Sequence, residues 1–384
     1  MRILHTGDWH VGRMIRGRSR AAEHEAVLAE IAAIADRERV DLVIVAGDLF
    51  DTAAPSPESE RIVYRALLAL AATDATVIAL AGNHDSDRRL QAVEPLLELG
   101  HVVTRPVFAK PDEGGVVRVA SRDGRETALV ACLPFLSQRW VVKADDLMAH
   151  TASASALQYA ERVRRLLAGL TDRFSADTVN LVAAHCMVHG AAVAGSERLA
   201  HTIFEYALGA TVFPSTAHYV ALGHLHRQQS LPGPCPIYYS GSPLQLDFGE
   251  EGEAKGVLLV EATAGRPASI TPVLLAGGRR LRTLRGTMVE LELMARADVG
   301  GDDYLRVVVQ EPARVGLADQ VRALLPGAVD VTIERPETGG APRERADRSG
   351  HSPHDLFAAY LTERGVDDER LTRLFGDLFE EASA

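Results

Sequence analysis

The sequence predicts an α/β protein in which a layered domain is followed by a small α+β unit and a helical tail. Three observations support this prediction. Short apolar runs alternate with longer helix-compatible segments as far as residue 275. Shorter strand-like and helix-like segments fill residues 276–334, and apolar residues recur at helical spacing in residues 351–384. Residues 335–350 are polar, contain proline and glycine and lack periodicity, so we expect a linker there.

The first domain, residues 1–275, is expected to contain strands at the apolar runs and helices at the segments rich in Ala, Leu, Arg and Glu. The strands are expected at Arg2–Leu4, Leu42–Ala46, Thr76–Leu80, Val116–Ala120, Thr127–Leu133, Thr178–Ala184, Tyr219–Leu222, Ile237–Tyr239 and Gly256–Glu261. The helices are expected at about 20–39, 57–72 and 154–170. Long helices between strands are typical of a layered α/β domain.

The small unit, residues 276–334, begins after the break Ala276-Gly277-Gly278. Strands are expected at Met288–Leu293, Tyr304–Val309 and Val329–Ile333, and a helix at Gly316–Leu325. In the tail, Ser352, Pro353 and Asp355 have the pattern of a helix start, with a capping serine, a first-turn proline and an acidic residue three positions on. We therefore expect short amphipathic helices beyond the linker.

The composition indicates a protein of the cytoplasm. The three cysteines are widely separated, which argues against a disulfide framework and against a cysteine zinc site. The N-terminus begins with a strand-like segment rather than a signal peptide, and no apolar run reaches the roughly 18 residues that a membrane span needs. We expect a soluble, unprocessed chain.

The net charge of −11 argues against a nucleic-acid partner, because phosphate backbones are bound by Lys and Arg. The charge is unevenly distributed, however. Residues 351–384 hold eight acidic and three basic side chains, so nearly half of the net charge lies in a tenth of the chain. The rest of the molecule is less acidic than the total suggests.

Polar residues follow five of the predicted strands, at the point where each strand ends. Ligand sites in open α/β sheets gather outside the carboxyl ends of the strands. Seven potential metal ligands are therefore expected at one crevice: Asp8, His10, Asp48, Asn83, His185, His224 and His226.

The spacing of these residues suits two metal ions. Residues i and i+2 of an extended segment project to the same side, so Asp8 with His10, and His224 with His226, can serve neighbouring metal positions. Imidazoles, carboxylates and an amide oxygen without thiolate suit manganese, iron, zinc or magnesium. With Asp48 shared, seven donors make two four-donor sets, which is the arrangement for two-metal hydrolysis of a phosphoester.

Each of these motifs also has a structural interpretation. An Asp-x-His pair after a strand is most often a satisfied turn, and a lone His185 in an apolar run is more often a core histidine. It is the set as a whole, in this order, that is specific. The remaining histidines match no part of the pattern and are interpreted as structural or solvated.

The series D-x-H, G-D-x-x-D, G-N-H-D, H and G-H-x-H resembles the calcineurin-like metallophosphoesterase superfamily. Within it, the chain resembles the SbcD family, the nuclease subunits of the bacterial SbcC-SbcD complex, which are related to the archaeal and eukaryotic double-strand-break repair nuclease. The stretches that support the narrower resemblance are LHTGDWHVGR, AGDLFDTAAPSP, AGNHDSDRR, SER (196–198), YVALGHLHRQQ, YYSGSPLQLDFGE and SPHDLFAAYLTERG. The resemblance covers nearly the whole chain, more loosely over residues 276–350.

The resemblance implies a layered β-sandwich domain flanked by helices, a small α+β DNA-capping domain and a helical partner-binding tail. It implies a metal-dependent nuclease of DNA repair, recombination and replication. Such an enzyme is a 3′–5′ exonuclease on double-stranded ends and an endonuclease on hairpins or single strands. It also implies two divalent ions, Mn²⁺ first, with Mg²⁺ or Fe²⁺ as alternatives.

The resemblance also assigns roles to the site residues. Asp8, His10, Asp48 and His226 would bind the first metal, and Asp48, Asn83, His185 and His224 the second. His84 would not be a ligand but a catalytic residue, which contacts the scissile phosphate and stabilises the transition state or protonates the leaving 3′ oxygen. Asp85 would orient the His84 imidazole, unless it only closes the turn. Archaeal and eukaryotic relatives have histidine where this chain has Asp51.

DNA and protein partners are implied as well. Two arginine groups are candidates for phosphate contact, although exposed arginines are usually only solvated: Arg13, Arg16 and Arg18, and Arg279, Arg280, Arg282 and Arg285. The resemblance implies a homodimer within a heterotetramer that contains an SbcC-type ABC ATPase with a coiled coil, and a nucleoid-associated location. The base of that coiled coil would bind Leu356, Phe357, Tyr360, Leu361, Leu374, Phe375 and Leu378, unless these helices pack back on their own domain.

Two other functions remain as alternatives. A small-molecule phosphodiesterase of the same superfamily would use the same metal site, but a mononucleotide substrate requires neither the second domain nor the tail. A DNA-end scaffold with weak activity would need some further defect, because all seven ligands and His84 are present. Cleavage of hairpin DNA beside a cyclic-nucleotide control separates the three.

Overall fold

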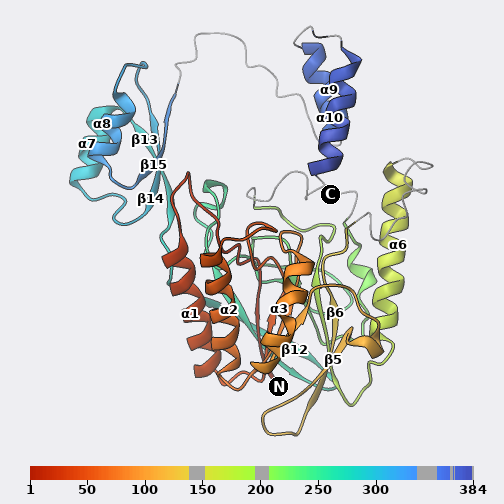
Figure 1. Ribbon diagram of the computed structural model, residues 1–384. Helices are drawn as coiled ribbons and strands as arrows, with labels where there is room; N and C mark the ends of the chain where they lie inside the picture. The colour runs from red at the N-terminus through yellow and green to blue at the C-terminus, as the bar shows by residue number, and fades with distance from the viewer. Residues whose placement is uncertain (138–151, 195–206, 335–352, 364–365, 367, 383–384) are drawn as a thin grey trace. The chain divides into compact units, whose positions relative to one another are not determined.

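The computed structural model describes residues 1–137, 152–194, 207–334, 353–363, 366 and 368–382. The chain forms two compact units, Met1–Glu334 and Arg335–Ala384 (Figure 1). The expected linker at 335–350 and the SER motif at 196–198 lie outside the described residues, as do the first two residues of the tail.

Two six-stranded sheets form the body of the first unit. The first has the order β12-β11-β1-β2-β3-β4, with β1 (Arg2–Thr6), β2 (Leu42–Val45), β3 (Thr76–Leu80), β4 (Val102–Arg105), β11 (Gly256–Thr263) and β12 (Arg266–Leu274). The second has the order β5-β6-β7-β8-β10-β9, with β5 (Val116–Ala120), β6 (Thr127–Leu133), β7 (Val179–His185), β8 (Tyr219–Gly223), β9 (Gln229–Leu231) and β10 (Ile237–Tyr239). Strands β1 to β4 are parallel to one another, and so are β6, β7 and β8.

The two sheets pack face to face, and helices cover their outer faces. One buried cluster joins Ile44 and Ile78 of the first sheet to Leu181 and Tyr219 of the second. Helices α1 (Ala21–Arg37), α2 (Pro57–Ala71) and α3 (Asp87–Leu99) cover the first sheet, and α6 (Ala152–Thr171) covers the second (Figure 1). Short 3₁₀ turns are η1 (Pro111–Glu113), η3 (Ala210–Val212) and η4 (Phe248–Glu250). The predicted layered β-sandwich flanked by helices is confirmed.

The central strands read as unbroken apolar runs because both of their faces are buried. All four residues of β2, Leu-Val-Ile-Val, are buried, with Val43 and Val45 toward the helices and Ile44 toward the other sheet. Parallel strands covered on both faces typically have this pattern. The sequence did not indicate α3, β4 or β12, whose side chains are more polar and more exposed.

A three-stranded parallel sheet follows the sandwich. Its order is β13-β14-β15, with β13 (Leu281–Gly286), β14 (Tyr304–Val309) and β15 (Ala328–Ile333), and its helices are α7 (Met288–Arg296) and α8 (Leu317–Leu324). The strand expected at Met288–Leu293 was wrong, because this segment begins α7. Thr287 and Glu290 form a capping box, in which each side chain accepts a hydrogen bond from the backbone N–H of the other. The missed first strand is the arginine-rich β13.

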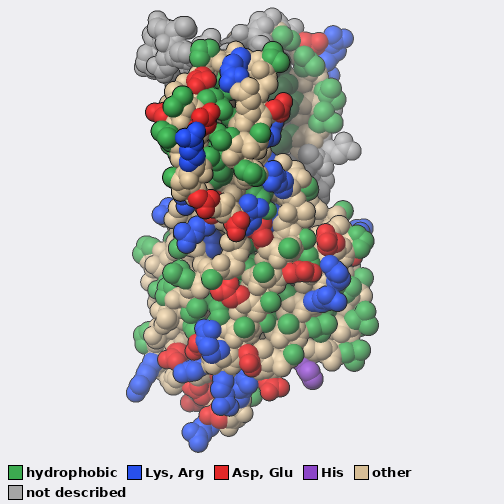
Figure 2. All heavy atoms as spheres, turned by 90° about the vertical axis from the view of Figure 1, so that its left-hand side faces the viewer, with side chains coloured by type: hydrophobic (Ala, Val, Ile, Leu, Met, Phe, Trp, Pro, Cys, Tyr) green, Lys and Arg blue, Asp and Glu red, His purple; other side chains and the backbone are tan. Residues whose placement is uncertain are grey.

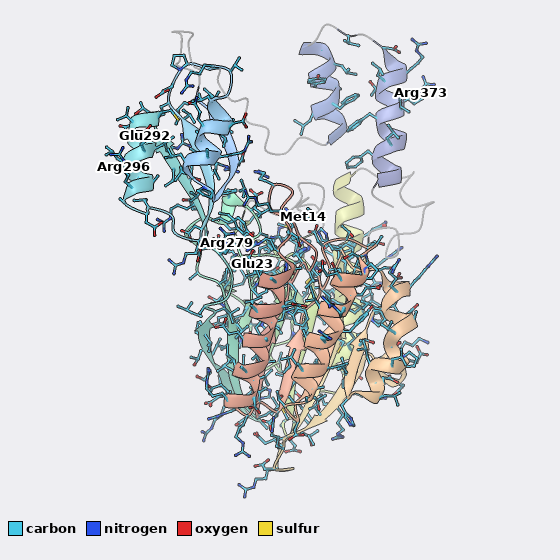
Figure 3. All side chains as sticks on the ribbon, turned by 60° about the vertical axis from the view of Figure 1, so that its left-hand side comes forward. Met14, Glu23, Arg279, Glu292, Arg296 and Arg373 are labelled. Atoms are coloured by element: carbon cyan, nitrogen blue, oxygen red, sulfur yellow. The ribbon has the colours of Figure 1, made fainter. Side chains whose placement is uncertain are left out.

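The three-stranded sheet is joined to the sandwich by a small apolar cluster and by charged contacts. Ile15, Phe248, Leu281 and Tyr304 are buried together. The Tyr304 hydroxyl donates to Glu23 Oε1 on α1 at 2.8 Å, and the Arg279 guanidinium lies 4.1 Å from the centre of the Tyr304 ring. Figure 3 shows Glu23 and Arg279 close together where the two parts meet.

The second unit consists of α9 (Pro353–Glu363) and α10 (Glu369–Ala382), which pack against each other. The Phe357 and Phe375 rings stack with their centres 4.2 Å apart. Large apolar side chains nevertheless stay exposed on this pair: Leu356, Tyr360, Leu371, Leu374 and Leu378. Leu361 is buried. No described helix of the chain is both long enough and apolar enough to cross a membrane.

A buried histidine links the two sheets and gives the stability of the fold a pH dependence. His5 Nε2 donates to the Leu222 carbonyl at 3.1 Å, and the Tyr219 hydroxyl lies 2.8 Å from His5 Nδ1. Burial lowers the pKa of His5 to about 3, below its ordinary value, so the ring is neutral in the folded chain. As the pH falls below about 6.5, the unfolded chain binds a proton at this residue that the folded chain does not, and stability is lost down to about pH 3.

We expect His5→Gln to reduce this pH dependence. In metal-free buffer, the loss of unfolding free energy between pH 7 and pH 5 should be about 2 kcal/mol smaller in the variant than in the original chain. Urea unfolding at the two pH values measures it. An unchanged pH dependence would show that His5 does not titrate between the folded and unfolded states.

Candidate metal centre

Five strands from both sheets bring the predicted ligands to one place. Strands β1, β2 and β3 of the first sheet and β7 and β8 of the second all end at the same edge of the sandwich, and a polar residue follows or closes each. Ligands at the carboxyl ends of parallel strands are typical of α/β proteins. Six of the seven predicted ligands are buried, and Asn83 is partly exposed: Asp8, His10, Asp48, His185, His224 and His226 are the buried ones.

Four of these residues adopt a left-handed backbone conformation. The φ angles are 51° at Asp8, 47° at His10, 51° at Asp48 and 109° at His224. Non-glycine residues rarely adopt positive φ, and such positions cluster at functional sites. We expected the Asp8 and His10 side chains to project to the same side because the chain would be extended there, and the backbone is not extended at these residues. Strand β1 ends at Thr6, and tight turns aim the two side chains.

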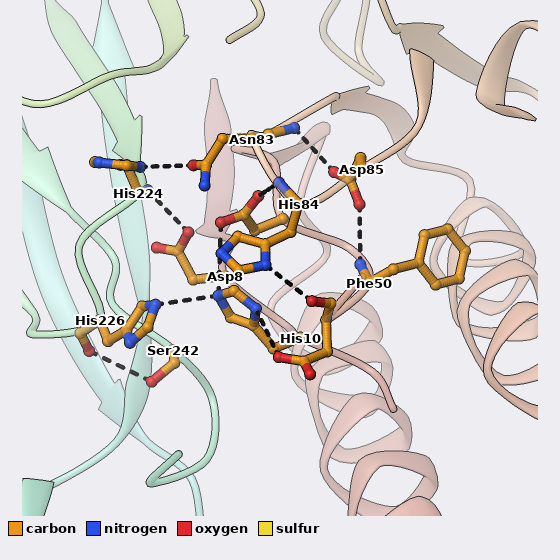
Figure 4. Close-up of polar contacts among 12 residues, drawn as sticks. Asp8, His10, Phe50, Asn83, His84, Asp85, His224, His226 and Ser242 are labelled. Carbon is orange, nitrogen blue, oxygen red and sulfur yellow. Dashed lines mark hydrogen bonds and ion pairs between the residues drawn. The ribbon is translucent and has the colours of Figure 1, made fainter. Parts of the chain in front are cut away.

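The first set of donors joins the end of β1 to the segment after β8. His10 Nε2 lies 3.1 Å from His226 Nε2 and 3.5 Å from Asp48 Oδ2. His226 Nδ1 lies 3.3 Å from the Glu250 carboxylate, which can only accept, so the hydrogen is on Nδ1. The Nε2 lone pair of His226 therefore faces His10, and Figure 4 shows this contact. Asp8 lies in the same close-up, and its Oδ1 accepts from the backbone N–H of His224 at 2.8 Å.

The second set joins the ends of β3, β7 and β8. Asn83 Oδ1 lies 2.9 Å from His185 Nε2 and 2.8 Å from His224 Nδ1. His185 Nδ1 donates to the Ala46 carbonyl at 2.8 Å, and burial lowers the His185 pKa, so its Nε2 carries a lone pair. A lone pair and an amide oxygen this close together can bind the same cation.

The Asp48 carboxylate lies between the two sets. Its Oδ1 accepts from the His84 backbone N–H at 2.8 Å, whereas its buried Oδ2 has no hydrogen-bond partner. That Oδ2 lies 3.5 Å from His10 Nε2 and 3.6 Å from His185 Nε2. Burial raises the Asp48 pKa, but the neighbouring histidines outweigh it and lower the pKa, so the carboxylate is charged. A buried, charged and unsatisfied oxygen is what a bridging metal ligand requires. The residues therefore fit a pair of cations.

Glycines allow the strand ends to approach this closely. A Cβ atom on Gly82 would lie 2.1 Å from Asp48 Oδ1, and one on Gly223 would lie 2.0 Å from the Ala46 carbonyl oxygen. Both distances are far inside van der Waals contact. The small residues before Asn83 and His224 are thus required by packing.

His84 lies in the turn after β3, and its ring is next to the first set of donors. Its Nδ1 donates to the Asp51 carbonyl at 2.8 Å, which directs Nε2 elsewhere, and its ring contacts the His10 ring edge-on at 4.7 Å (Figure 4). His84 is partly exposed, unlike the six buried ligands. Ligand atoms of His10, Asp48 and His84 lie within 4.8 Å of one another, so the imidazole is adjacent to a metal position.

The Asp85 carboxylate contacts the backbone of the turn that carries Asn83 and His84. It accepts backbone hydrogen bonds from Gly82 at 2.9 Å, Phe50 at 2.9 Å and Leu49 at 3.1 Å, which closes the turn and ties it to the segment after β2. Burial and the charge of Asp48 raise the Asp85 pKa to about 7, and the three N–H groups oppose that rise. These contacts favour the turn-closing interpretation of Asp85, and the Asp51 carbonyl is the acceptor for the His84 imidazole.

Asp51 and Glu250 are two residues near the site to which the sequence pattern assigned no role. Asp51 Oδ1 lies 3.7 Å from His10 Nδ1 and 3.2 Å from the Arg13 guanidinium. Burial raises the Asp51 pKa, but the nearby His10 ring and the Arg13 charge lower it to about 2. Asp51 could have been found in the sequence as the second aspartate of the G-D-x-x-D motif. The last residue of DFGE was the signal for Glu250.

The arginines proposed for phosphate contact are largely paired within the molecule. Arg16 contacts Asp330 at 3.0 Å and Asp247 at 3.3 Å, and Arg282 contacts Asp303 at 3.0 Å. Others bond carbonyl or carboxylate oxygens: Arg13 to Asp51, Arg18 to Pro326, Arg279 to Asp302 and Asp303, and Arg285 to Glu334. Figure 2 shows basic and acidic side chains interspersed on the face that lies on the left-hand side of Figure 1. Several of these arginines thus join parts of the first unit. Arg280 lines a crevice of about 510 Å³ together with Leu244, Glu251 and Lys255.

The chain is similar to known proteins over nearly its full length. The model of the calcineurin-like phosphoesterase family matches residues 1–228. The SbcD subunit of the SbcCD nuclease of Bacillus subtilis (strain 168) is 32% identical over 397 residues, covering 98% of this chain and 97% of that protein. The same subunit from Rhodobacter capsulatus is 35% identical and covers 94% of each chain. That from Escherichia coli (strain K12) is 28% identical, covering 97% of this chain and 96% of its own.

Proposed function

The chain belongs to the SbcD family within the calcineurin-like phosphoesterases, and from this we propose that it is the nuclease subunit of a DNA-end-processing complex. As a metal-dependent phosphodiesterase it would hydrolyse DNA, as a 3′–5′ exonuclease at double-stranded ends and as an endonuclease in hairpins and single strands. Its role would lie in DNA repair, recombination and replication.

The observation that supports this proposal most strongly is the buried Asp48 Oδ2, without a hydrogen bond and flanked by two sets of donors. Asp8, His10, Asp48 and His226 would hold one ion, and Asp48, Asn83, His185 and His224 the other. Two such ions polarise a phosphodiester and supply a nucleophile at neutral pH. The donors suit Mn²⁺, which we propose as the ion used, with Mg²⁺ or Fe²⁺ as alternatives.

His84 would act on the phosphate from beside the metals. Its Nδ1–H is held by the Asp51 carbonyl, so Nε2 is the atom available to the scissile phosphate or the leaving 3′ oxygen. A partly exposed imidazole next to a buried ligand set is well placed to stabilise the transition state or to donate a proton. Asp51 would keep the ring in that orientation.

The C-terminal pair of helices would bind the partner ATPase. The exposed side chains of Leu374 and Leu378 lie one helical turn apart on α10, and Tyr360 and Leu356 have the same spacing on α9. The base of an SbcC-type coiled coil would cover them as a helix-in-groove contact. The complex would contain two copies of each chain and would act in the cytoplasm, at the nucleoid.

We expect Leu374→Asp with Leu378→Asp to abolish copurification of the SbcC-type ATPase and leave the first unit intact. Both side chains are about half exposed, so the changes should not disturb the packing of Phe357 on Phe375. A pull-down with purified partner measures the loss, and nuclease activity of the isolated chain is the control. Undiminished partner binding would locate the contact elsewhere.

One experiment tests the function itself. The purified chain is incubated with Mn²⁺ and labelled hairpin DNA, with and without the ATPase, beside a cyclic-nucleotide substrate. Hairpin cleavage without cyclic-nucleotide hydrolysis supports the nuclease. Hydrolysis of the cyclic nucleotide alone would instead identify a small-molecule phosphodiesterase, and no hydrolysis of either would leave an end-binding scaffold.

A further inference from the structure

A fully buried carboxylate lies directly behind the ligand His226. Glu250 ends the short turn η4, its side chain has no exposed surface, and its Oε1 lies 3.3 Å from His226 Nδ1. Its Oε2 lies 2.5 Å from Lys255 Nζ. This residue closes the DFGE stretch, which contributed to the family resemblance but received no role there.

Three further contacts hold Glu250 and the His226 backbone in place. The backbone N–H of Leu246 donates to Glu250 Oε2 at 3.1 Å, and the Gln245 side chain donates to the Glu250 carbonyl at 3.1 Å. Lys255 Nζ also donates to the His226 carbonyl at 3.0 Å. One lysine therefore anchors both the ligand's backbone and the carboxylate that contacts its ring.

The lysine also makes the buried charge tolerable. Glu250 Oε2 lies 2.5 Å from the Lys255 ammonium and accepts the Leu246 backbone N–H at 3.1 Å. A buried carboxylate with a cationic partner and several donors stays ionised. An ionised carboxylate offers no proton, so the hydrogen in the contact with His226 must come from the imidazole.

We propose that Glu250 is a positioning residue that fixes the tautomer and ring direction of His226 for the first metal. This inference rests on the proposed two-metal function. With the hydrogen held on Nδ1, the Nε2 lone pair faces His10 Nε2 at 3.1 Å, on the side where Asp8 and Asp48 lie. A carboxylate behind a metal-binding histidine commonly sets its orientation and basicity.

In the second set, backbone does this for His185. His185 Nδ1 donates to the Ala46 carbonyl, which no substitution removes. In the first set, the corresponding contact of His226 is made by the Glu250 side chain, so loss of Glu250 should affect the first metal position more than the second. That inequality separates positioning from a general structural role.

The test is Glu250→Gln, studied by Mn²⁺ titration of the metal-free chain with calorimetry and electron paramagnetic resonance. The single amide oxygen should turn to Lys255, so the NH₂ group would face His226 and favour the hydrogen on Nε2. We expect Mn²⁺ affinity at the first position to fall about 10- to 100-fold. Affinity at the second should stay unchanged, and the resonance signal of the coupled ion pair should be lost.

Histidine-selective ¹⁵N NMR of the metal-free chain gives a second readout. It should show the His226 hydrogen on Nδ1 in the original chain and on Nε2 in the variant. Glu253→Gln is the matched control, because Glu253 also contacts Lys255, at 3.1 Å, whereas the carboxylate that contacts the His226 ring is that of Glu250. The control variant should bind both ions normally.

The outcomes are distinguishable. Unchanged affinity at both positions in Glu250→Gln would overturn the inference while leaving the proposed function standing. An equal loss at both positions, with a lower unfolding temperature, would assign Glu250 a general structural role and also overturn it. If the unsubstituted chain bound no Mn²⁺, the proposed function would fail, and this inference with it.

Discussion

Replacing His84 with glutamine should lower Mn²⁺-dependent cleavage of hairpin DNA by about 10²- to 10⁴-fold while both metal ions stay bound. The imidazole is beside the metal sets, and its Nδ1 is already used by the Asp51 carbonyl. Glutamine can keep that bond through its amide but offers no group that transfers a proton near neutral pH. The chemical step should therefore fail in a site that is otherwise complete.

Single-turnover cleavage and Mn²⁺ titration measure the two halves of this expectation. His101→Gln is the matched control, because His101 is exposed and follows α3, away from the ligands. This control variant should cleave DNA normally. Loss of one Mn²⁺ ion from the His84 variant would make His84 a ligand, and near-normal cleavage would remove it from catalysis. Either result would contradict the proposed role of His84.

Asp48→Asn should remove both metal ions and reduce cleavage by at least about 10³-fold. Asparagine has the same shape and can still accept the hydrogen bond from the His84 backbone, so the fold should persist. It loses the negative charge that lies between the two sets of donors. In the original chain, Asp48 Oδ2 lies 3.5 Å from His10 Nε2 and 3.6 Å from His185 Nε2. This single substitution should be more damaging to metal binding than loss of any ligand that serves one position.

Calorimetric titration with Mn²⁺ measures the number of bound ions, and circular dichroism checks the fold. Asp74→Asn is the control, because the Asp74 side chain is 92% exposed. It should bind two ions. Retention of two ions by the Asp48 variant would show that this carboxylate does not bridge the sets.

The sandwich and the positions of the candidate ligands were predictable, because strands buried on both faces have largely apolar sequences. Leu42–Val45 is an unbroken apolar run, and Val179–His185 is apolar except for Asn180 and the closing histidine. A polar residue at the end of such a run is conspicuous. All seven predicted ligands come from such positions, and the structure brings them together around Asp48.

What the sequence could not supply depends on contacts between distant segments. Met288–Arg296 has an apolar pattern compatible with a strand, and the capping box of Thr287 with Glu290 decides for a helix. The left-handed conformations of Asp8, His10, Asp48 and His224 are imposed by the surrounding turns, not by local preference. The contact of Glu250 with His226 joins residues well separated along the chain and has no local signature.

The role of the arginines could not be predicted from the sequence either. Clusters such as Arg279 to Arg285 look alike in sequence whether they bind phosphate or the protein itself. The structure uses Arg16, Arg279 and Arg282 in contacts with Asp330, Tyr304 and Asp303. Only the partners, which lie far along the chain, distinguish the two uses.

The most direct test of the two-metal site is anomalous X-ray diffraction from crystals of the chain soaked in Mn²⁺. Two peaks should lie about 3.5 to 4 Å apart, on either side of Asp48 Oδ2. One should be bound by His10 and His226, the other by Asn83, His185 and His224, with His84 bound to neither. A single peak, or a peak coordinated by His84, would contradict a two-metal site bridged by Asp48.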